Sequence, residues 1–506
     1  MARIAVIGAG MGAMAAAARL AVAGHRVVVY ERAATYGGAV RRFEREGFAF
    51  DTGPGLLPLP AVYRDLFVKT GKQPLEECVE LVQVDPSSRH LFADGTQVSL
   101  PNASRAGVVT ALDEALGTGA GKRWGDFLVR AREAWDRTRR PLLEEPLWPN
   151  WQVLADREPY PSVPHKKLLR TRRATTLAEV AAWELRDPRL AALLESHALA
   201  CGLDPRTTPA AAAVLPYMEH AFGTWYVRGG IGELARAVYE RCLARRVEFR
   251  FDASVERIVE KDGRAAGVEL AGGTSQAFSG GGTVEDADFV VAGVAPGVLD
   301  SLVPGTALRG AGEVAPQHGA PSRLTVLLAL RGGRPEGVAH RTVVHTADRE
   351  DELGRLFGEH PGLPAAPTVM VSRPDDPALV PDAEHEAATL TVTVPSGLAV
   401  SESEVERVLD VAERAIPGLR DRLLWHEVRT PADIAETTGA DGGAVPAPAL
   451  AAADGRLLHP SNGTRMPGLF AAGGWAHPGG GLPHAGMSGA LVAGLIVEGP
   501  EFRGSQ

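Results

Sequence analysis

The residues whose spacing most clearly suggests chemistry lie near the start of the chain, in a glycine-rich turn. Residues 8–13 read GAGMGA and stand directly after a short apolar run. Gly8 permits a tight turn, Gly10 leaves room for a pyrophosphate to approach the backbone, and Gly12 continues the turn into a helix. The free amide groups and the positive dipole end of that helix would bind the pyrophosphate. The turn therefore predicts a dinucleotide site.

Two further residues refine this site. Ala13 stands at the third fingerprint position, which sets only the packing of helix on strand and accepts alanine. Glu31 ends the next apolar run, where a carboxylate can bind a ribose hydroxyl. Because a carboxylate would repel the 2′-phosphate of NADP, Glu31 argues against that cofactor. The alternative interpretation is a glycine-rich turn in an ordinary α/β domain.

Cysteine chemistry and metal binding have little material in this sequence. The three cysteines, Cys78, Cys201 and Cys242, are far apart, and none forms a Cys-x-x-Cys pair. This spacing disfavours a disulfide framework, a zinc site and a dithiol redox enzyme. No metal site and no nucleophile triad are predicted.

The elements around the turn can hold it in place. Residues 3–7 (RIAVI) and 26–30 (RVVVY) predict strands, and the alanine-rich residues 13–23 between them predict a helix. Together they form a β-α-β unit of about 30 residues. Strands that alternate with helices favour a parallel sheet covered on both faces, so the fold class is α/β with a Rossmann-like domain.

The rest of the chain changes character along its length. Residues 105–220 are rich in helix formers and carry five of the eight tryptophans. Strand-like runs return at 246–251, 288–293, 324–330 and 389–394, and an apolar helix is expected at 485–497. Residues 271–283 predict a loop or hairpin without chemistry of its own.

The totals bound the class of protein. A chain of 506 residues is too long for one ordinary core and suggests two or three compact units. Its 45% hydrophobic and 23% charged residues are typical of a globular enzyme. The net charge of −9 and the lack of a long basic stripe make nucleic acid a poor candidate partner.

Compartment and membrane contact can also be weighed from the sequence. The apolar residues 4–24 contain glycines and follow no basic segment, so we do not interpret them as a targeting signal. Few cysteines fit a cytoplasmic protein. Residues 148–164, rich in tryptophan and proline, precede the basic residues 165–173. This order suits peripheral membrane contact through 148–173, although a solvated charged face beside a packed loop is the alternative.

A family resemblance begins after Glu31. A Gly-Gly pair at 37–38 is followed by the run FAFDTGPGLL at 48–57. This stretch resembles the start of the phytoene desaturase and amine oxidase superfamily of flavoproteins. The resemblance implies FAD as the cofactor, in a discontinuous domain of the glutathione reductase type. It also implies that five residues lie along the FAD: Gly37, Gly38, Arg42, Asp51 and Gly53.

The resemblance recurs in the middle of the chain. Residues 187–238 resemble the region of carotenoid desaturases in which a helical substrate segment leads into a Trp…Gly-Gly-x-x-x-Leu turn. Val255 matches a backbone position that contacts the adenine side in this family, and residues 430–444 resemble its threonine-proline segment. Glu219, His220, Trp225 and Tyr226 would lie where the substrate region meets the flavin. Core packing of the aromatic residues is the alternative.

The segment 468–496 is similar to the motif that closes the flavin site in this family, and its core is most like that of phytoene desaturases. Gly473, Gly474 and Gly481 are small where a ring system and a pyrophosphate approach the backbone. Two histidines of this motif, His477 and His484, are the candidate catalytic residues, since either could face the flavin or the substrate. A structural hydrogen bond to the backbone is the alternative for each.

The function implied by the resemblance is hydride transfer between a lipophilic, polyene-type substrate and flavin N5, with the flavin supplying the difficult chemistry. Several other functions stay open. Relatives in natural-product pathways reduce or cyclise polyenes, as in tetramate macrolactam assembly, and others are isomerases. A flavin amine oxidase is disfavoured by the last motif. The remaining alternative is a flavin-binding protein without catalysis.

The motifs also predict how the chain is divided. Segments 1–75, 225–305 and 415–506 carry the flavin motifs and are expected to form an FAD-binding domain. Segments 76–224 and 306–414 are expected to form a mixed α+β substrate-binding domain. The substrate should then enter between the two domains, in a cleft lined by apolar side chains. The sequence does not define the oligomeric state.

Overall fold

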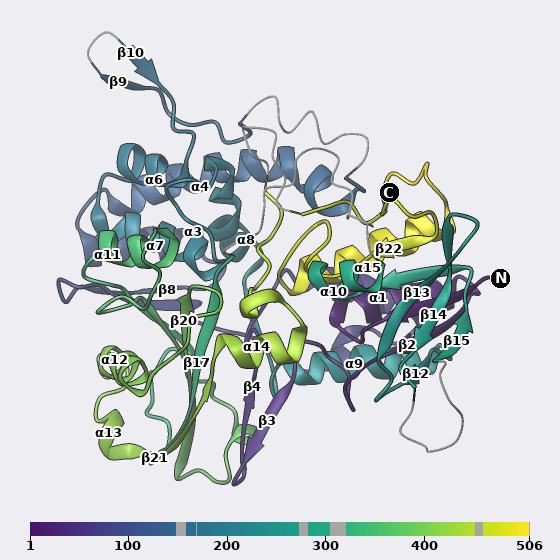
Figure 1. Cartoon of the computed structure of the whole chain (residues 1–506). Helices are drawn as coiled ribbons and strands as arrows, with labels where there is room; N and C mark the ends of the chain where they lie inside the picture. Colours follow the sequence, from purple (N-terminus) through teal and green to yellow (C-terminus); the bar gives the residue numbers. More distant parts are fainter. Residues whose placement is uncertain (148–157, 168–169, 273–281, 304–319, 451–458, 505–506) are drawn as a thin grey trace.

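A computed structural model of the chain describes residues 1–147, 158–167, 170–272, 282–303, 320–450 and 459–504 (Figure 1). Most of the predicted loop at 271–283 lies outside these residues. Trp148 and Trp151 lie wholly outside them. The α/β fold class predicted from the sequence is confirmed, since both parallel and antiparallel sheets are packed with helices.

A five-stranded parallel sheet combines strands from the first and the last segments of the chain. Its order is β12-β2-β1-β16-β22, so neighbouring strands come from distant parts of the sequence. The bounds are β1 Arg3–Ile7, β2 Arg26–Tyr30, β12 Glu248–Arg250, β16 Phe289–Ala292 and β22 Leu469–Ala471. Each of the four pairs of neighbours is parallel. The sheet thereby joins the predicted strands at 3–7 and 26–30 to the segments near residues 250, 290 and 470.

The two faces of this sheet are covered differently. Ile4 and Val6 of β1 lie in a buried cluster with the helices α1, α9 and α15, whereas Ala5 and Ile7 point to the opposite face. That second face is covered by α10 and by an antiparallel sheet of order β13-β14-β15. The bounds are α1 Met11–Val22, α9 Ile231–Ala244, α15 Leu482–Val497, α10 Pro296–Leu302, β13 Val255–Lys261, β14 Arg264–Leu270 and β15 Thr283–Asp286.

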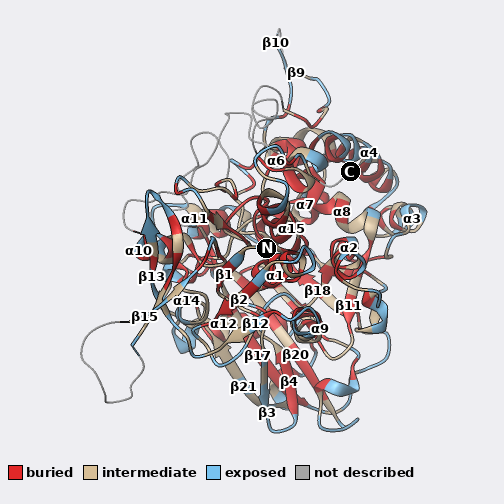
Figure 2. Cartoon of the chain, turned by 90° about the vertical axis from the view of Figure 1, so that its right-hand side faces the viewer, coloured by how far each residue is buried: buried red, intermediate tan, exposed pale blue. Residues whose placement is uncertain are grey.

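Helices α1 and α15 meet through glycines. A Cβ atom on Gly489 would lie 2.4 Å from the Gly12 carbonyl oxygen, and a Cβ on Gly12 would lie 2.6 Å from Gly473 Cα. Such distances leave no room for a side chain. Both helices are mostly buried at the centre of the molecule (Figure 2). The N-terminal and C-terminal segments are therefore held together at backbone contact.

A seven-stranded mixed sheet forms a second body. Its order is β21-β17-β20-β19-β18-β7-β8, and the one parallel pair is β18 with β7. The strands are β7 Ser88–Leu91, β8 Gln97–Leu100, β17 Ser322–Arg331, β18 Arg341–Val344, β19 Val369–Ser372, β20 His385–Val394 and β21 Leu423–Arg429. The helices beside them are α11 Arg349–Phe357, α12 Glu402–Ala412, α13 Leu419–Arg422 and α14 Pro431–Thr438.

The position of β21 differs from the boundary predicted at residue 415. β21 pairs with β17 along most of its length, so the chain leaves the seven-stranded sheet only after residue 429. The flavin-like motifs gave no information on this strand, because none of them includes it. The remaining domain boundaries stay predictions.

The tryptophan-rich middle of the chain is helical, as expected. Its helices are α3 Arg105–Leu116, α4 Ala120–Arg139, α6 Leu177–Val180, α7 Pro188–Ala200 and α8 Val214–Phe222. Trp124 and Trp135 are buried in their shared core, together with residues of α2 (Ala61–Thr70). Short helical turns in this region are η2 Arg140–Glu144, η3 Ala181–Leu185 and η4 Ala210–Ala213. Others lie elsewhere in the chain: η1 Leu75–Glu77, η5 Pro377–Leu379 and η6 Asp441–Gly443.

Three small groups of strands lie outside these larger sheets. A three-stranded sheet of order β5-β11-β6 joins Leu57–Pro58, Thr224–Val227 and Leu81–Gln83. The hairpin of β3 (Arg42–Arg45) and β4 (Phe48–Asp51) packs its phenylalanines against the seven-stranded sheet. The hairpin of β9 (His165–Lys167) and β10 (Arg170–Arg172) projects from the helical region (Figure 1). None of the described helices is long and apolar enough to cross a membrane.

The contact between α1 and α15 makes a direct prediction about stability. Gly489→Ala should lower the free energy of unfolding by roughly 1–3 kcal/mol or more, because the new methyl group meets backbone. Gly354→Ala in α11 is the matched control, since its Cβ would have no atom within 4 Å. That control should be neutral or stabilising. Chemical denaturation of both variants measures the difference, and equal stability of the two would contradict the packing.

Candidate functional site

The glycine-rich turn at residues 8–13 has the conformation predicted for it. Gly8 has a φ of 90° and donates its amide hydrogen to the Tyr30 carbonyl oxygen at 2.8 Å. Helix α1 begins at Met11, and its N-cap residue Gly10 provides no side-chain cap. Ala13 lies so close to Gly293 that a Cβ there would come within 2.7 Å of the Ala13 methyl. The amide groups of the first turn of α1 are thus available for an anion.

Two glycines leave open space beside this helix end. A Cβ on Gly10 or on Gly473 would have no atom of the protein within 4 Å. Gly12, between them, is pressed against the Gly473 backbone. The first turn of α1 and the loop before α15 therefore form the two sides of one cradle, and its dimensions are kept by glycine. This arrangement fits the pyrophosphate of a dinucleotide.

Glu31 is buried beside the same turn. One of its carboxylate oxygens accepts a hydrogen bond from the Ala9 amide at 2.7 Å, and the other accepts from the Ala33 amide at 2.9 Å. The carboxylate thus fixes the turn as well as the loop after β2. Its place at the end of β2 is the one predicted for a ribose ligand, and that role stays a prediction.

The predicted Gly-Gly pair also packs on the turn. The Gly37 amide donates to the Ala9 carbonyl oxygen at 2.9 Å, and a Cβ on Gly38 would lie 3.0 Å from Gly10 Cα. Gly37 and Gly38 have φ values of 106° and 63°, which favour glycine. A Cβ on Gly53 would lie 2.6 Å from the Ala39 carbonyl oxygen. All three glycines therefore lie in the same layer, close to the cradle.

Arg42 and Asp51 have structural partners. Arg42 donates to the Gly229 carbonyl oxygen at 2.9 Å, and Asp51 accepts from the Ile231 and Gly232 amides at 2.9 Å and 3.1 Å. Asp51 thus caps the start of α9. Burial raises the pKa of the Asp51 carboxyl from 3.8 to about 6, although both amide hydrogen bonds and Arg42 favour its charged form. The hairpin that carries these two residues thereby fixes the turn at 229–232.

Val255 is half-buried at the start of β13 and packs in the cluster beneath the first sheet. The segment before it is tied to the dinucleotide turn, because the Ala253 amide donates to the Glu31 carbonyl oxygen at 2.9 Å. This places Val255 two residues from the contact with Glu31. Its predicted approach to an adenine is compatible with this position and stays a prediction.

The loop before α15 is held by polar side chains that the sequence did not indicate. Ser488 accepts a hydrogen bond from the Gly473 amide at 2.9 Å. The buried Asn462 side-chain amide lies 2.7 Å from the His477 carbonyl oxygen and 3.1 Å from Ser488 Oγ. Asn462 lies outside every recognised motif, so only the three-dimensional structure could reveal its role. A Cβ on Gly474 would collide with Pro446 at 2.8 Å, so the loop is also tightly packed.

The two predicted catalytic histidines have different surroundings. The His477 ring is buried, and its Nε2 is 3.0 Å from the Glu145 carbonyl oxygen. His484 is half-buried in the first turn of α15, next to the N-cap residue Gly481, and has no hydrogen-bond partner in the described part of the chain. Burial lowers the pKa of His477 to about 3 and that of His484 to about 4, so both rings are neutral near pH 7. The geometry leaves His484 the more accessible of the two.

Apolar side chains of α2, α8 and α15 belong to one cluster. Val62 of α2 and both Leu215 and Met218 of α8 are buried in one cluster, and Met487, one turn after His484, packs against it. Tyr63 of α2 donates its hydroxyl hydrogen to the Leu482 carbonyl oxygen at 2.9 Å, which fixes the start of α15. One apolar cluster therefore includes residues of α2, α8 and α15. Apolar side chains of this kind line sites for lipophilic ligands.

Comparison with protein families confirms the predicted resemblance. A family described as flavin containing amine oxidoreductase matches residues 14–497. The chain is 30% identical to the hydroxyneurosporene desaturase of Rhodobacter capsulatus, over 98% of this chain and 97% of that protein. It is 29% identical to the 4,4'-diapolycopene oxygenase of Methylomonas sp, over 98% of both chains. The family match confirms the predicted flavin cofactor, FAD.

Solved structures share the fold at lower identity. An oxidoreductase from Methanosarcina mazei has a TM-score of 0.62 at 18% identity and covers 97% of this chain and 99% of its own. A putrescine oxidase bound to putrescine has a TM-score of 0.64 at 14% identity and covers 98% of this chain and 99% of its own. Both similarities support the fold and carry no information on the substrate.

Gly10 allows a test of the cradle that separates binding from folding. Gly10→Val should abolish FAD retention, because the side chain would fill the space of the pyrophosphate. The apoprotein should fold normally, since a Cβ at this position meets no protein atom and its φ of −75° suits any residue. Absorbance after gel filtration reports FAD, and circular dichroism reports the fold. A folded variant with full FAD content would contradict the assigned site.

Asp51 predicts a specific pH dependence. A carboxyl whose folded-state pKa is raised stabilises the fold most below its unfolded pKa of 3.8, and this contribution is lost as the pH rises through about 6. Asp51→Asn stays neutral, so its unfolding free energy relative to wild type should increase between about pH 4 and pH 7. Urea denaturation at several pH values measures this change. A difference that does not vary with pH would contradict the raised pKa.

Proposed function

The chain belongs to the flavin containing amine oxidoreductase family, in the branch of the carotenoid desaturases, and from this we propose that it oxidises or reduces a lipophilic polyene. It is an FAD-dependent oxidoreductase that acts on CH–CH bonds. The observation that most strongly supports the substrate class is the apolar cluster of α2, α8 and α15 beside the cradle. When bound, FAD would accept or donate a hydride at N5 of its ring system.

The residues that would hold FAD are those of the cradle. The first-turn amides of α1 would bind the pyrophosphate, with Gly10 and Gly473 providing the space. Glu31 would bind the ribose, and the segment at 253–255 would flank the adenine. The N-terminus of α15 would place its positive dipole end near the flavin ring.

The chain's own residues would position the substrate and exclude water. Val62, Leu215, Met218 and Met487 belong to one apolar cluster, against which a polyene chain would pack. His484 has a neutral ring, is half-buried and has no hydrogen-bond partner among the described residues, so it can accept or donate a proton beside the reacting carbon. His477 instead holds residues 477–481 to the Glu145 backbone. We therefore assign His484 proton transfer and His477 a positioning role.

A direct test of this proposal is anaerobic mixing of the FAD-loaded enzyme with acyclic polyene hydrocarbons. Loss of the oxidised-flavin absorbance is the expected result, and putrescine serves as the control for amine oxidase chemistry. Flavin reduction by the amine and not by polyenes would favour an amine oxidase. No reduction by either would favour reductive chemistry or a flavin-binding protein, and mass spectrometry of compounds that accumulate after gene deletion would identify the substrate.

The histidines give a prediction on rate. His484→Ala should slow flavin reduction or reoxidation by substrate by roughly 10²–10⁴ while FAD stays bound. Because the pKa of His484 is lowered to about 4, the wild-type rate should not decline between pH 8 and pH 6. His477→Ala should weaken FAD retention instead. Wild-type turnover in both variants would show that neither ring transfers a proton.

Peripheral membrane contact is a second part of the proposal. It is supported by the exposed hairpin β9–β10, on which Lys166, Arg170 and Arg172 are exposed. Arg172 also lies over the Trp183 ring, with 5.7 Å between Arg172 Cζ and the ring centroid. Cations beside an indole suit an interface with anionic lipid headgroups. This contact would bring the enzyme to a lipophilic substrate in the membrane.

The hairpin can be tested by charge reversal. Changing Lys166, Arg170 and Arg172 to Glu should reduce co-sedimentation with phosphatidylglycerol vesicles by about tenfold or more, since each cation near the surface contributes about 1 kcal/mol. The matched control reverses Arg257, Lys261 and Arg264 on the exposed strands β13 and β14. Equal loss of vesicle binding in both triple variants would indicate that net charge alone drives the binding. Unchanged binding in the hairpin variant would contradict the proposed contact.

A further inference from the structure

An interior ion pair lies at the far end of α8, where three elements meet. Glu219 near the end of α8 pairs with Arg341 at the start of β18, and His197 Nε2 of α7 lies 3.8 Å from its second carboxylate oxygen. The side chains of Glu219, Arg341 and His197 keep 19%, 17% and 18% of their surface accessible. Each therefore borders accessible space although it lies within the protein.

The guanidinium of Arg341 has unused hydrogen-bond donors. A guanidinium carries five N–H donors, and among the described residues Glu219 is its one recorded partner. Its Nε is buried without any acceptor. A buried donor without a partner costs about 1–3 kcal/mol, which suggests that another group completes this site.

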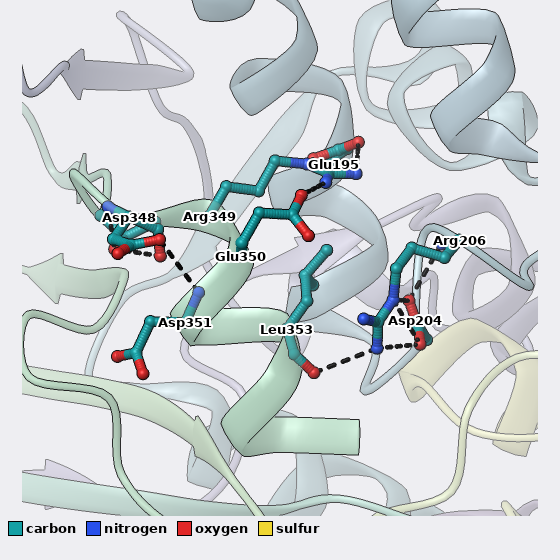
Figure 3. A network of polar contacts seen from close by, with 9 residues as sticks. Glu195, Asp204, Arg206, Asp348, Arg349, Glu350, Asp351 and Leu353 are labelled. Carbon is teal, nitrogen blue, oxygen red and sulfur yellow. Dashed lines mark hydrogen bonds and ion pairs between the residues drawn. The ribbon is translucent and has the colours of Figure 1, made fainter. Parts of the chain in front are cut away.

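Two other arginines show what a saturated ion pair looks like in this protein. Arg373, in the same sheet, binds Glu386 through Nε and Nη2 and the Ala415 carbonyl oxygen through Nη1. Arg349 of α11 binds Glu195 of α7 through two nitrogens and Glu350 through the third (Figure 3). Their guanidiniums are used on all three nitrogens. Arg341 differs from both because it is paired through a single nitrogen.

The apolar cluster leads to this ion pair. Leu215 and Glu219 are four residues apart and share a face of α8. Leu215 and Met218 belong to the cluster that Met487 of α15 joins. An apolar chain whose reacting carbons lie near His484 would thus extend along α8 and end at Glu219 and Arg341.

Three other titratable groups, all histidines, lie beside the pair. His90 Nδ1 and His345 Nε2 are 2.9 Å apart in a buried pair, and Ser88 binds the other nitrogen of His90. Burial lowers the pKa values of His90, His197 and His345. Burial opposes ionisation of Glu219, but the adjacent Arg341 guanidinium outweighs it, so the pKa of Glu219 is lowered. The site therefore offers one cation and one anion side by side.

We propose that Glu219 and Arg341 form a polar subsite that binds a terminal hydroxyl group of the substrate chain. This proposal rests on the proposed function, which supplies the lipophilic chain. A hydroxyl group can accept a hydrogen bond from Arg341 and donate one to the Glu219 carboxylate, so it uses both charges. A hydrocarbon end would leave the donors of Arg341 unpaired in an apolar surrounding. The enzyme is thereby selective for a polyene with an oxygen-bearing end.

The test compares two conjugated polyenes of equal length, one a hydrocarbon and one with a terminal hydroxyl. Quenching of tryptophan fluorescence gives the Kd of each with the FAD-loaded enzyme, and flavin reduction gives kcat/KM. Wild type should bind and turn over the alcohol at least about tenfold better, as expected for a hydrogen bond to a charged group. The double variant Arg341→Met, Glu219→Met should bring both ratios close to one, and removing both charges avoids an unpaired ion.

The matched control is the double variant Arg349→Met, Glu195→Met, which removes a saturated Arg–Glu pair between α11 and α7. This control should keep the wild-type ratios of Kd and of kcat/KM between the two polyenes. Equal Kd values for the two polyenes in wild type, or an unchanged ratio in the Arg341–Glu219 variant, would overturn the subsite. Failure of the proposed function is distinguishable, since the binding preference would then persist without flavin reduction. If neither polyene binds, both proposals fail.

Discussion

The backbone contact between α1 and α15 is the constraint on which the rest of the molecule depends. Gly12, Gly473 and Gly489 bring the first and last segments of the chain to distances at which no side chain fits. Because α1 follows β1 and α15 follows β22, this contact aligns the two helix starts at one edge of the parallel sheet. The first turn of α1 and the positive end of α15 would then face the same ligand. A side chain at Gly12 or Gly489 would push the two parts of the cradle apart.

The substrate region is tied to the cradle by polar contacts as well as by packing. Asp51 caps α9, Arg42 binds the Gly229 carbonyl oxygen, and Asp376 accepts from both Tyr226 and the Gly229 amide. The turn at 226–232 is therefore fixed from the flavin side and from the seven-stranded sheet. The positions of α8 and β11 follow from this turn. A chain-like ligand would thus be held at a defined distance from the flavin ring.

The sequence predicted those parts of the site that depend on local backbone geometry. The turn at 8–13, Glu31 and the glycines of 473–481 could be recognised because each must meet a steric or electrostatic demand within a few residues. Asn462 and Asp376 could not, because each acts on backbone more than nine residues away and lies outside every recognised motif. The same reason explains why the sequence did not indicate β21, since strand pairing is a long-range property. Separate roles for His477 and His484 also required the structure, because only the fold places Glu145 against one ring.

We propose that one FAD lies between α1 and the loop before α15, beside the apolar cluster that includes residues of α8. A crystal structure of the FAD-loaded enzyme would test it most directly. We expect the pyrophosphate over Gly10 and against Gly473, the ribose at Glu31, and the flavin ring at the start of α15 with His484 nearby. A flavin bound elsewhere, or a cradle filled by side chains in the loaded enzyme, would contradict the account.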